Sequence, residues 1–170
     1  MDAIVKNKND AETQIVAFKL EEEEFAINIH HVREVLKMTQ VTPLPQSAYF
    51  IEGVINLRGE VMPVIDLRKR FELDVGERGE DTRIIIVEIQ ENKVGLIVDS
   101  VTEVLRLSST EIQPPPSKIA GTRTDFIKGV GKIDDRLLII LDMDKILTTE
   151  EVISMEEITL SEQEKIGTQT

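Results

Sequence analysis

Cysteine and tryptophan are missing from this sequence of 170 residues, and aromatic residues make up only 4% of it. Without cysteine, disulfides, thiolate metal sites and cysteine nucleophiles are excluded. Because aromatic rings are so few, a chain that is 41% hydrophobic must build its core mainly from Ile, Val and Leu. Residues branched at Cβ favour strands. The composition therefore predicts a mainly β protein, with room for one domain or two small ones.

Basic residues are also in short supply, since 20 Lys and Arg stand against 32 Asp and Glu and give a net charge of −12. Phosphate backbones and anionic membrane surfaces are bound chiefly by Lys and Arg, so we expect no nucleic-acid partner. No apolar run approaches the ~18 residues that span a bilayer, and we expect no direct membrane insertion. Residues 1–12 are polar and lack the apolar centre of a signal peptide. These features together predict a cytoplasmic protein.

The sequence contains an internal duplication. Residues 25–36 (FAINIHHVREVL) match residues 94–105 (VGLIVDSVTEVL) at an offset of 69. Residues 50–67 match residues 126–143 at an offset of 76, with Gly and Asp at shared positions. Two matching blocks in the same order indicate a repeated structural unit. The larger second offset means that the second copy carries seven more residues between its blocks, around 114–124.

Alternating apolar residues and turn residues predict a series of short strands. These are residues 14–20, 25–29, 54–57, 61–65, 83–89, 94–98, 127–133 and 137–141. Val32, Val35 and Leu36 have i, i+3, i+4 spacing, which predicts a short helical turn. Thr148 and Glu151 fit a capping box, so we expect a helical tail over 148–166.

Each copy thus supplies about five short strands, which suit a small closed or nearly closed barrel. We place the first barrel at about 21–73 and the second at about 82–147, with the N-terminal strand 14–20 packing near the second. The charged segment 74–81 is the expected linker between the halves. Residues 1–12 and 167–170 are expected to be disordered. A groove between two such barrels is a typical place for a binding site.

Residues able to carry chemistry are few. Asp66 and Asp142 occupy equivalent positions in the duplication and could form a carboxylate pair that shares a proton. Each precedes a helical pattern, however, and capping of two short helices explains both. His30 and His31 are adjacent, so on a helix their side chains diverge by ~100° and cannot readily share a metal. The sequence holds no glycine-rich phosphate loop and no serine nucleophile elbow, so we expect no catalysis, cofactor or metal.

The run FIEGVINLRGEVMPVIDL at 50–67 resembles the signature of CheW, the coupling protein family of bacterial chemotaxis. Residues 94–105, 112–116 and 126–131 also resemble that family, and the likeness covers about 13–150. The resemblance implies two SH3-like five-stranded barrels around a shared hydrophobic core.

The same resemblance implies a function and partners. A member of this family links transmembrane chemoreceptors to the histidine kinase CheA, binding the regulatory domain of CheA and the cytoplasmic tip of the receptor. The alternative is the coupling half of a CheV-type scaffold or a kinase-regulatory module. We expect the free chain to be a monomer.

The strongest candidate for a binding surface is the hairpin tip Asn56, Leu57, Arg58 and Gly59. Gly59 is explained by a turn that needs φ > 0. Arg58 either pairs with an acidic residue of its own barrel or contacts a partner through its planar guanidinium. The second copy has Asp134 at this position, so only one barrel is expected to carry a basic tip.

Further candidates rest on the resemblance. Val32, Glu34 and Gly53 fall where the family binds its receptor, although Val32 could equally belong to the core and Glu34 to a solvated face. Val98 and Val101 of the second copy are candidates with the same alternatives.

Overall fold

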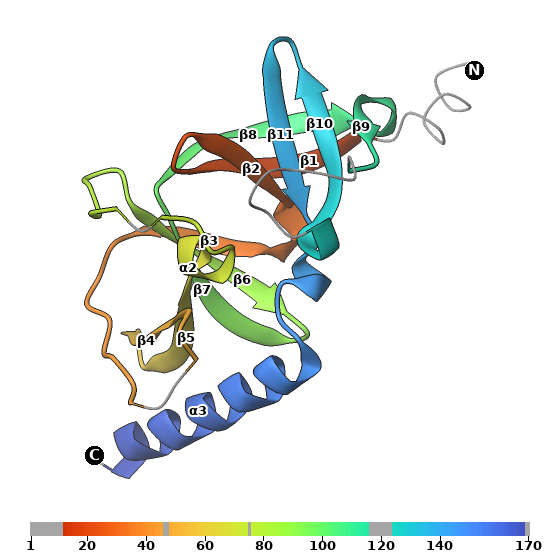
Figure 1. The fold of residues 1–170 in the computed structure, drawn as a ribbon. Coiled ribbons are helices and arrows are strands. Elements are labelled where there is room, and N and C mark those ends of the chain that lie inside the picture. Colours follow the sequence, from red (N-terminus) through yellow and green to blue (C-terminus); the bar gives the residue numbers. More distant parts are fainter. Residues whose placement is uncertain (1–11, 46–47, 75, 116–123, 169–170) are drawn as a thin grey trace.

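The computed structural model describes residues 12–45, 48–74, 76–115 and 124–168, and its strands form two sheets stacked one above the other (Figure 1). Sheet A contains, in spatial order, β8 (Ser100–Ser108), β1 (Glu12–Leu20), β2 (Glu23–Asn28), β11 (Arg136–Leu141), β10 (Ile127–Ile133) and β9 (Ile112–Gln113). Sheet B contains β3 (Val32–Lys37), β6 (Arg83–Ile89), β7 (Asn92–Val98), β5 (Glu60–Asp66) and β4 (Ile51–Leu57). The expected mainly β fold with two SH3-like barrels is confirmed.

Short helical segments join these strands. They are the 3-10 turns η1 (Ile29–His31), η2 (Ser109–Glu111), η3 (Thr124–Phe126) and η4 (Met143–Lys145), the helix α2 (Leu67–Arg70), and the C-terminal helix α3 (Thr149–Thr168). As predicted, Asp66 caps α2 and Asp142 caps η4. The capping box of Thr148 and Glu151 also forms. Among the described residues, no helix is both long and apolar enough to cross a membrane.

The segments expected to be disordered are mostly outside the described residues, namely 1–11 and 169–170. Glu12, by contrast, begins β1, and α3 continues through 167–168. The predicted strands all form, with bounds shifted by a few residues. The turn between β6 and β7 lies at Gln90 and Glu91, which both have positive φ angles.

The helical turn predicted over residues 32–36 is wrong, because these residues form β3. Val32, Glu34 and Leu36 are half-buried, whereas Val35 is exposed. Spacing of apolar residues alone could not separate the two structures, since hydrogen bonding to β6 decides the outcome. The helical part is instead η1, just before the strand.

The two repeats exchange their first hairpins. In sheet A, the β1–β2 hairpin of the first repeat lies between β8 and β11 of the second repeat. In sheet B, the β6–β7 hairpin of the second repeat lies between β3 and β5 of the first repeat. The predicted barrel ranges are therefore wrong for β2, β6 and β7, whereas the strand 14–20 does lie with the second barrel, beside β8. Residues 74–81 separate the repeats but not the barrels. Alternation within a strand is the same whichever sheet receives it, so the sequence pattern could not reveal this exchange.

The registers bear out the duplication despite the exchange. Ile15 pairs with Asn28 in one hairpin, and Ile84 with Ile97 in the other, each 69 positions later. The later strands follow the offset of 76. Residue 51 pairs with residue 65, and 76 positions later residue 127 pairs with residue 141. In both hairpins the register shifts between this pair and the next glycine of the first strand.

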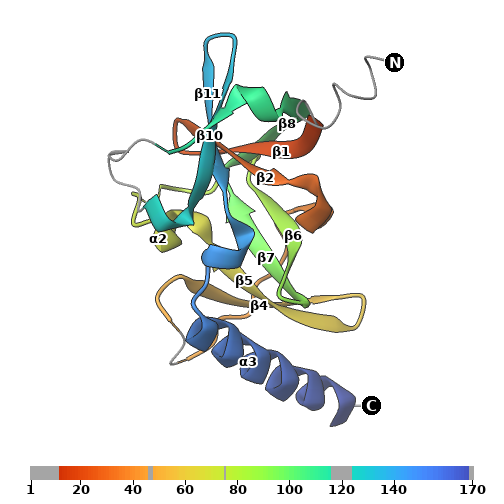
Figure 2. The same cartoon turned by 90° about the vertical axis from the view of Figure 1, so that its right-hand side faces the viewer.

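The largest buried cluster lies between the sheets and is shared by both barrels. All five phenylalanines of the chain belong to it, namely Phe18, Phe25, Phe50, Phe71 and Phe126. Four of the rings form a chain, with centroids 6.1, 5.8 and 5.4 Å apart in the order 18, 25, 71 and 126. Smaller clusters lie on the opposite face of each sheet, away from this shared cluster. Figure 2 shows the stacking from the side, with α3 beneath β4 and β5.

Two ion pairs at equivalent positions of the barrels have opposite polarity. In sheet B, Lys93 of β7 pairs with Glu60 of β5 at 3.1 Å. In sheet A, the equivalent positions on β2 and β11 hold Glu24 and Arg136, paired at 2.7 Å. The exchanged arrangement therefore brings unlike charges together. Pairing each hairpin within its own repeat would instead place Glu24 beside Glu60 and Lys93 beside Arg136.

Candidate protein-binding surface

The turn between β4 and β5 has the conformation that the sequence predicted. Arg58 and Gly59 have φ angles of 54° and 89°, as a two-residue hairpin turn requires. The Gly59 amide donates to Asn56 Oδ1 at 2.9 Å. A Cβ at Gly59 would meet no atom within 4 Å, so backbone conformation, and not crowding, explains the glycine.

Arg58 forms an ion pair with Glu34, with Nη2 2.6 Å from Oε2. Glu34 lies on β3 and Arg58 at the end of β4, which are the two outermost strands in the order of sheet B. The ion pair thus links the two edge strands of sheet B. The expected pairing within the barrel is present, yet 70% of the Arg58 side chain remains exposed. A guanidinium has five N–H donors, so one ion pair leaves others facing solvent.

Gly53 lies at the other end of β4, away from the turn, and is buried. Its φ is 149°, and a Cβ there would lie 2.0 Å from the carbonyl oxygen of Thr42. Thr42 and Val54 exchange two backbone hydrogen bonds of 2.8 and 2.9 Å at this point. At the equivalent Gly129, a Cβ would lie 2.9 Å from the carbonyl oxygen of Gln113. Close passage of a neighbouring segment therefore explains both glycines.

The three candidate valines pack inward. Val98 ends β7 and is fully buried in the shared core. Val32 and Val101 are half-buried and pack against that core from equivalent positions, opposite Val87 and Phe18. The core alternative for Val32 therefore holds in this structure. Of the nine predicted residues, the fold brings the Asn56–Gly59 turn and Glu34 together as one exposed surface.

The turn of the second hairpin holds Asp134 and Asp135, and an arginine, Arg136, follows it as the first residue of β11. Asp134 occupies the place of Arg58, but Arg136 lies two residues later and pairs with Glu24 and Glu103. Hydrogen bonding to Arg136 lowers the pKa of Glu24, against the opposing effect of burial. Hydrogen bonds from Arg136 to both carboxylates raise the pKa of the guanidinium. The Arg136 side chain is only 35% exposed, so Arg58 is the more open of the two.

The carboxylates considered for catalysis have structural roles. Asp66 is fully buried, accepts from the Arg68 amide, and forms an ion pair with the Arg68 side chain. Arg68 also reaches Asp99 at 3.1 Å, between β7 and β8. Burial opposes its charge, yet hydrogen bonding and attraction to Asp66 raise the pKa of Arg68 overall. Asp142 accepts from the Asp144 amide as a cap. No local sequence pattern marks this buried arginine.

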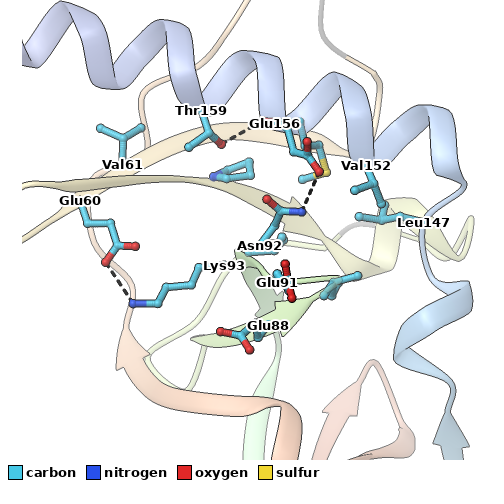
Figure 3. A pocket seen from close by; sticks show the side chains of 14 residues that line it. Glu60, Val61, Glu88, Glu91, Asn92, Lys93, Leu147, Val152, Glu156 and Thr159 are labelled. Carbon is cyan, nitrogen blue, oxygen red and sulfur yellow. Dashed lines mark hydrogen bonds and ion pairs between the residues drawn. The ribbon is translucent and has the colours of Figure 1, made fainter.

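A pocket of about 220 Å³ lies between α3 and the start of β5 and β7 (Figure 3). Its charged side chains are largely engaged, since Glu60 pairs with Lys93 and the Asn92 amide donates to Glu156 on α3. Within the described part of the chain, no group of three His, Cys, Asp or Glu residues could hold a metal ion. His30 and His31 both lie in η1.

Comparison with known proteins places this fold. The model of the CheW-like domain family matches residues 14–151. A chemotaxis protein CheW of Treponema pallidum is 35% identical over 148 residues, covering 85% of this chain and 87% of the relative. A CheW of Thermotoga maritima is 35% identical over 151 residues, covering 89% and 93%. A chemotaxis protein CheV3 of Helicobacter pylori is 29% identical over 126 residues, covering 72% of this chain and 40% of that protein.

A solved structure agrees with these sequence matches. The scaffolding protein TtCheW of Thermoanaerobacter tengcongensis superposes with a TM-score of 0.76 at 42% identity, covering 82% of this chain and 94% of the other. Fold, duplicated registers and sequence similarity over most of the length lead to one assignment. The chain belongs to the CheW family of chemotaxis scaffolding proteins.

Proposed function

We propose that this chain is a non-catalytic adaptor that couples chemoreceptors to the histidine kinase CheA in the cytoplasm. Membership of the CheW family supports the proposal, as do two similar barrels whose hairpin tips differ in charge and exposure. An adaptor needs two surfaces, so that the state of one partner can bias the geometry of the other. Its partners are the cytoplasmic tip of a receptor and the regulatory domain of CheA. The likeness to CheV3 makes the coupling half of a CheV-type scaffold the second candidate.

The observation that carries this proposal is the exposed ion pair between Arg58 and Glu34. Arg58 lies in the hairpin turn, and its exposed guanidinium is next to Leu57, which is half-buried. Arginine is favoured at protein interfaces because one side chain supplies several donors and an apolar stem. The proposed surface consists of this turn with Glu34. The other predicted residues lie inside the protein or pack against its core, namely Val32, Gly53, Val98 and Val101.

The test is Arg58→Glu in the full chain. We expect binding to the receptor tip or to the CheA regulatory domain to weaken by about tenfold or more, because a like charge then faces Glu34 and a contact is lost. Isothermal titration with each purified partner measures the effect. Arg33→Glu is the matched control, since Arg33 is a neighbouring arginine on β3 that pairs with Glu88. Binding of both partners at wild-type affinity would remove the turn from the surface.

A charge-reversed double variant separates two roles of Arg58. Arg58→Glu combined with Glu34→Arg rebuilds the ion pair with opposite polarity and so keeps the link between the edge strands. If Arg58 touches the partner, affinity stays low in the double variant. Full recovery would mean that the ion pair matters only as a link between the strands, which contradicts direct contact by Arg58.

A further inference from the structure

The helix α3 contacts the hairpin of the candidate surface through the side chain of Gln163. Gln163 Oε1 accepts from the Val61 amide at 2.9 Å, and Gln163 Nε2 donates to the Gly59 carbonyl at 3.0 Å. A side-chain amide carries one kind of donor and one kind of acceptor, as a peptide group does. Gln163 therefore binds the start of β5 as a residue of a neighbouring strand would.

This contact falls where β5 has no strand on that side. The described pairing of β5 with β7 involves Val64, Ile65 and Asp66 only, whereas α3 covers the first part of β5 (Figures 1 and 2). The buried Val61 would lose its amide hydrogen bond if Gln163 were absent. An unsatisfied buried N–H is costly, so this glutamine matters more than a typical exposed one.

In the second half of α3, Ile166 also faces the hairpin, since it lines a pocket with Val54, Ile55 and Val61. Val152 and Met155, in its first half, are buried in the shared core, but Leu160 is 66% exposed. Val61 lines two pockets, one with Met155 and Thr159 of α3 and the other with Glu162 and Ile166. Side chains of α3 therefore do not fill all the space beside Val61, and the two hydrogen bonds of Gln163 link the helix directly to the hairpin.

We propose that Gln163 is a positioning residue, through which α3 holds the Asn56–Gly59 turn in the conformation that binds a partner. This inference rests on the proposed function for its binding step. The family match ends at residue 151, three residues into α3, so the feature lies in a segment beyond the matched domain. The Gly59 carbonyl accepts from Gln163, and the Gly59 amide donates to Asn56. Both backbone polar groups of Gly59 are therefore hydrogen-bonded to side chains.

The experiment compares Gln163→Ala, Gln163→Glu and the control Glu164→Ala in the full chain. Glu164 is exposed on the same turn of helix. Exchange of the Val61 amide, followed by nuclear magnetic resonance, should become about fivefold to tenfold faster in Gln163→Ala, the loss expected for one hydrogen bond. The Ile85 amide in the centre of sheet B should not change. Gln163→Glu keeps the acceptor but sets a carboxylate against the Gly59 carbonyl, so it should fall between wild type and Gln163→Ala.

Binding of a purified receptor tip and of the CheA regulatory domain is measured on the same variants. We expect Gln163→Ala to lower affinity for the partner that Arg58→Glu affects by about threefold to tenfold. Unchanged Val61 exchange would overturn the inference at its structural step. Faster exchange with unchanged affinity, in a protein where Arg58→Glu does weaken binding, would overturn it at its functional step. If wild type binds neither partner, the proposed function fails, while the exchange result still decides whether Gln163 holds the hairpin.

Discussion

Arg70 places its guanidinium between two phenylalanines that are equivalent in the duplication. The distance from Arg70 Cζ to the ring centroid is 4.7 Å for Phe50 and 5.0 Å for Phe126. The same group donates to the Ile146 carbonyl at 2.7 Å and pairs with Glu151 of α3 at 2.9 Å. One side chain of α2 therefore contacts both repeats and the C-terminal helix.

Removal of this side chain should be strongly destabilising. We expect Arg70→Ala to lower the free energy of unfolding by about 3 kcal/mol, because the carboxylate of Glu151 and the Ile146 carbonyl lose their partner and two ring contacts vanish. Urea denaturation followed by circular dichroism measures the loss. Arg106→Ala is the control, since that side chain is 69% exposed and its ion pair with Glu12 spans 3.9 Å; it should cost under about 0.5 kcal/mol. Equal losses for the two variants would contradict this role for Arg70.

Single positions differ in how far the sequence alone predicts them. The conformation of Arg58 and Gly59 follows from a local rule about hairpin turns, and the capping of Asp66 and Asp142 follows from another. Arg70 and Gln163 could not be found in this way. Their partners lie 76 and about 100 residues away in the chain, and no local pattern records such a contact.

The exchange of hairpins requires β2 to pair with β11 and β7 to pair with β5. The two ion pairs of opposite polarity favour these strand partners. Exchanging the charges of the hairpins, with Glu24→Lys and Lys93→Glu together, keeps net charge constant but sets like charges beside Arg136 and Glu60. We expect the free energy of unfolding to fall by about 2 kcal/mol, measured by urea denaturation.

Restoring the pairs supplies the control. Adding Glu60→Lys and Arg136→Glu to the hairpin exchange makes both pairs unlike in charge again, so about half of the lost free energy should return. Recovery is incomplete because a glutamate at 136 lies near Glu103. No recovery at all would show that the charges do not contribute to the choice of strand partner.

Among the elements, β3 shows why sequence periodicity fails on short segments. Three apolar residues within five positions fit a helix, yet pairing with β6 makes this segment a strand with a register shift after Val32. Val32 packs against the shared core, Leu36 packs against the cluster on the other face of sheet B, and Val35 is exposed. The strands β6 and β10, by contrast, have the bounds that were predicted, because runs of β-branched residues bounded by turn residues mark strands. The exchange of hairpins could not be predicted from the sequence, since both repeats have the same pattern of strands.

Sheet B consists of one continuous stretch of chain, whereas sheet A is assembled from segments on either side of it. We expect a fragment of residues 29–99, which holds every strand of sheet B, to lack cooperative unfolding in urea. Its inward residues Ile65, Val87 and Leu96 are buried in the shared core and would be exposed without sheet A. A unit of about 70 residues is only marginally stable even with a complete core. A sharp transition with the midpoint of the full chain would show that the barrel folds independently.

The chain passes between the two barrels twice, and the two passages are far apart. One follows β2 through η1, at the open end of the β1–β2 hairpin. The other is at Asp99, which hydrogen-bonds with Lys19 and Glu21 at the closed end of the same hairpin. A single linker would act as a swivel, but two attachment points separated by the length of a strand resist twisting. A torque applied to one barrel by a bound partner is therefore delivered to the other barrel as a rotation of the whole body.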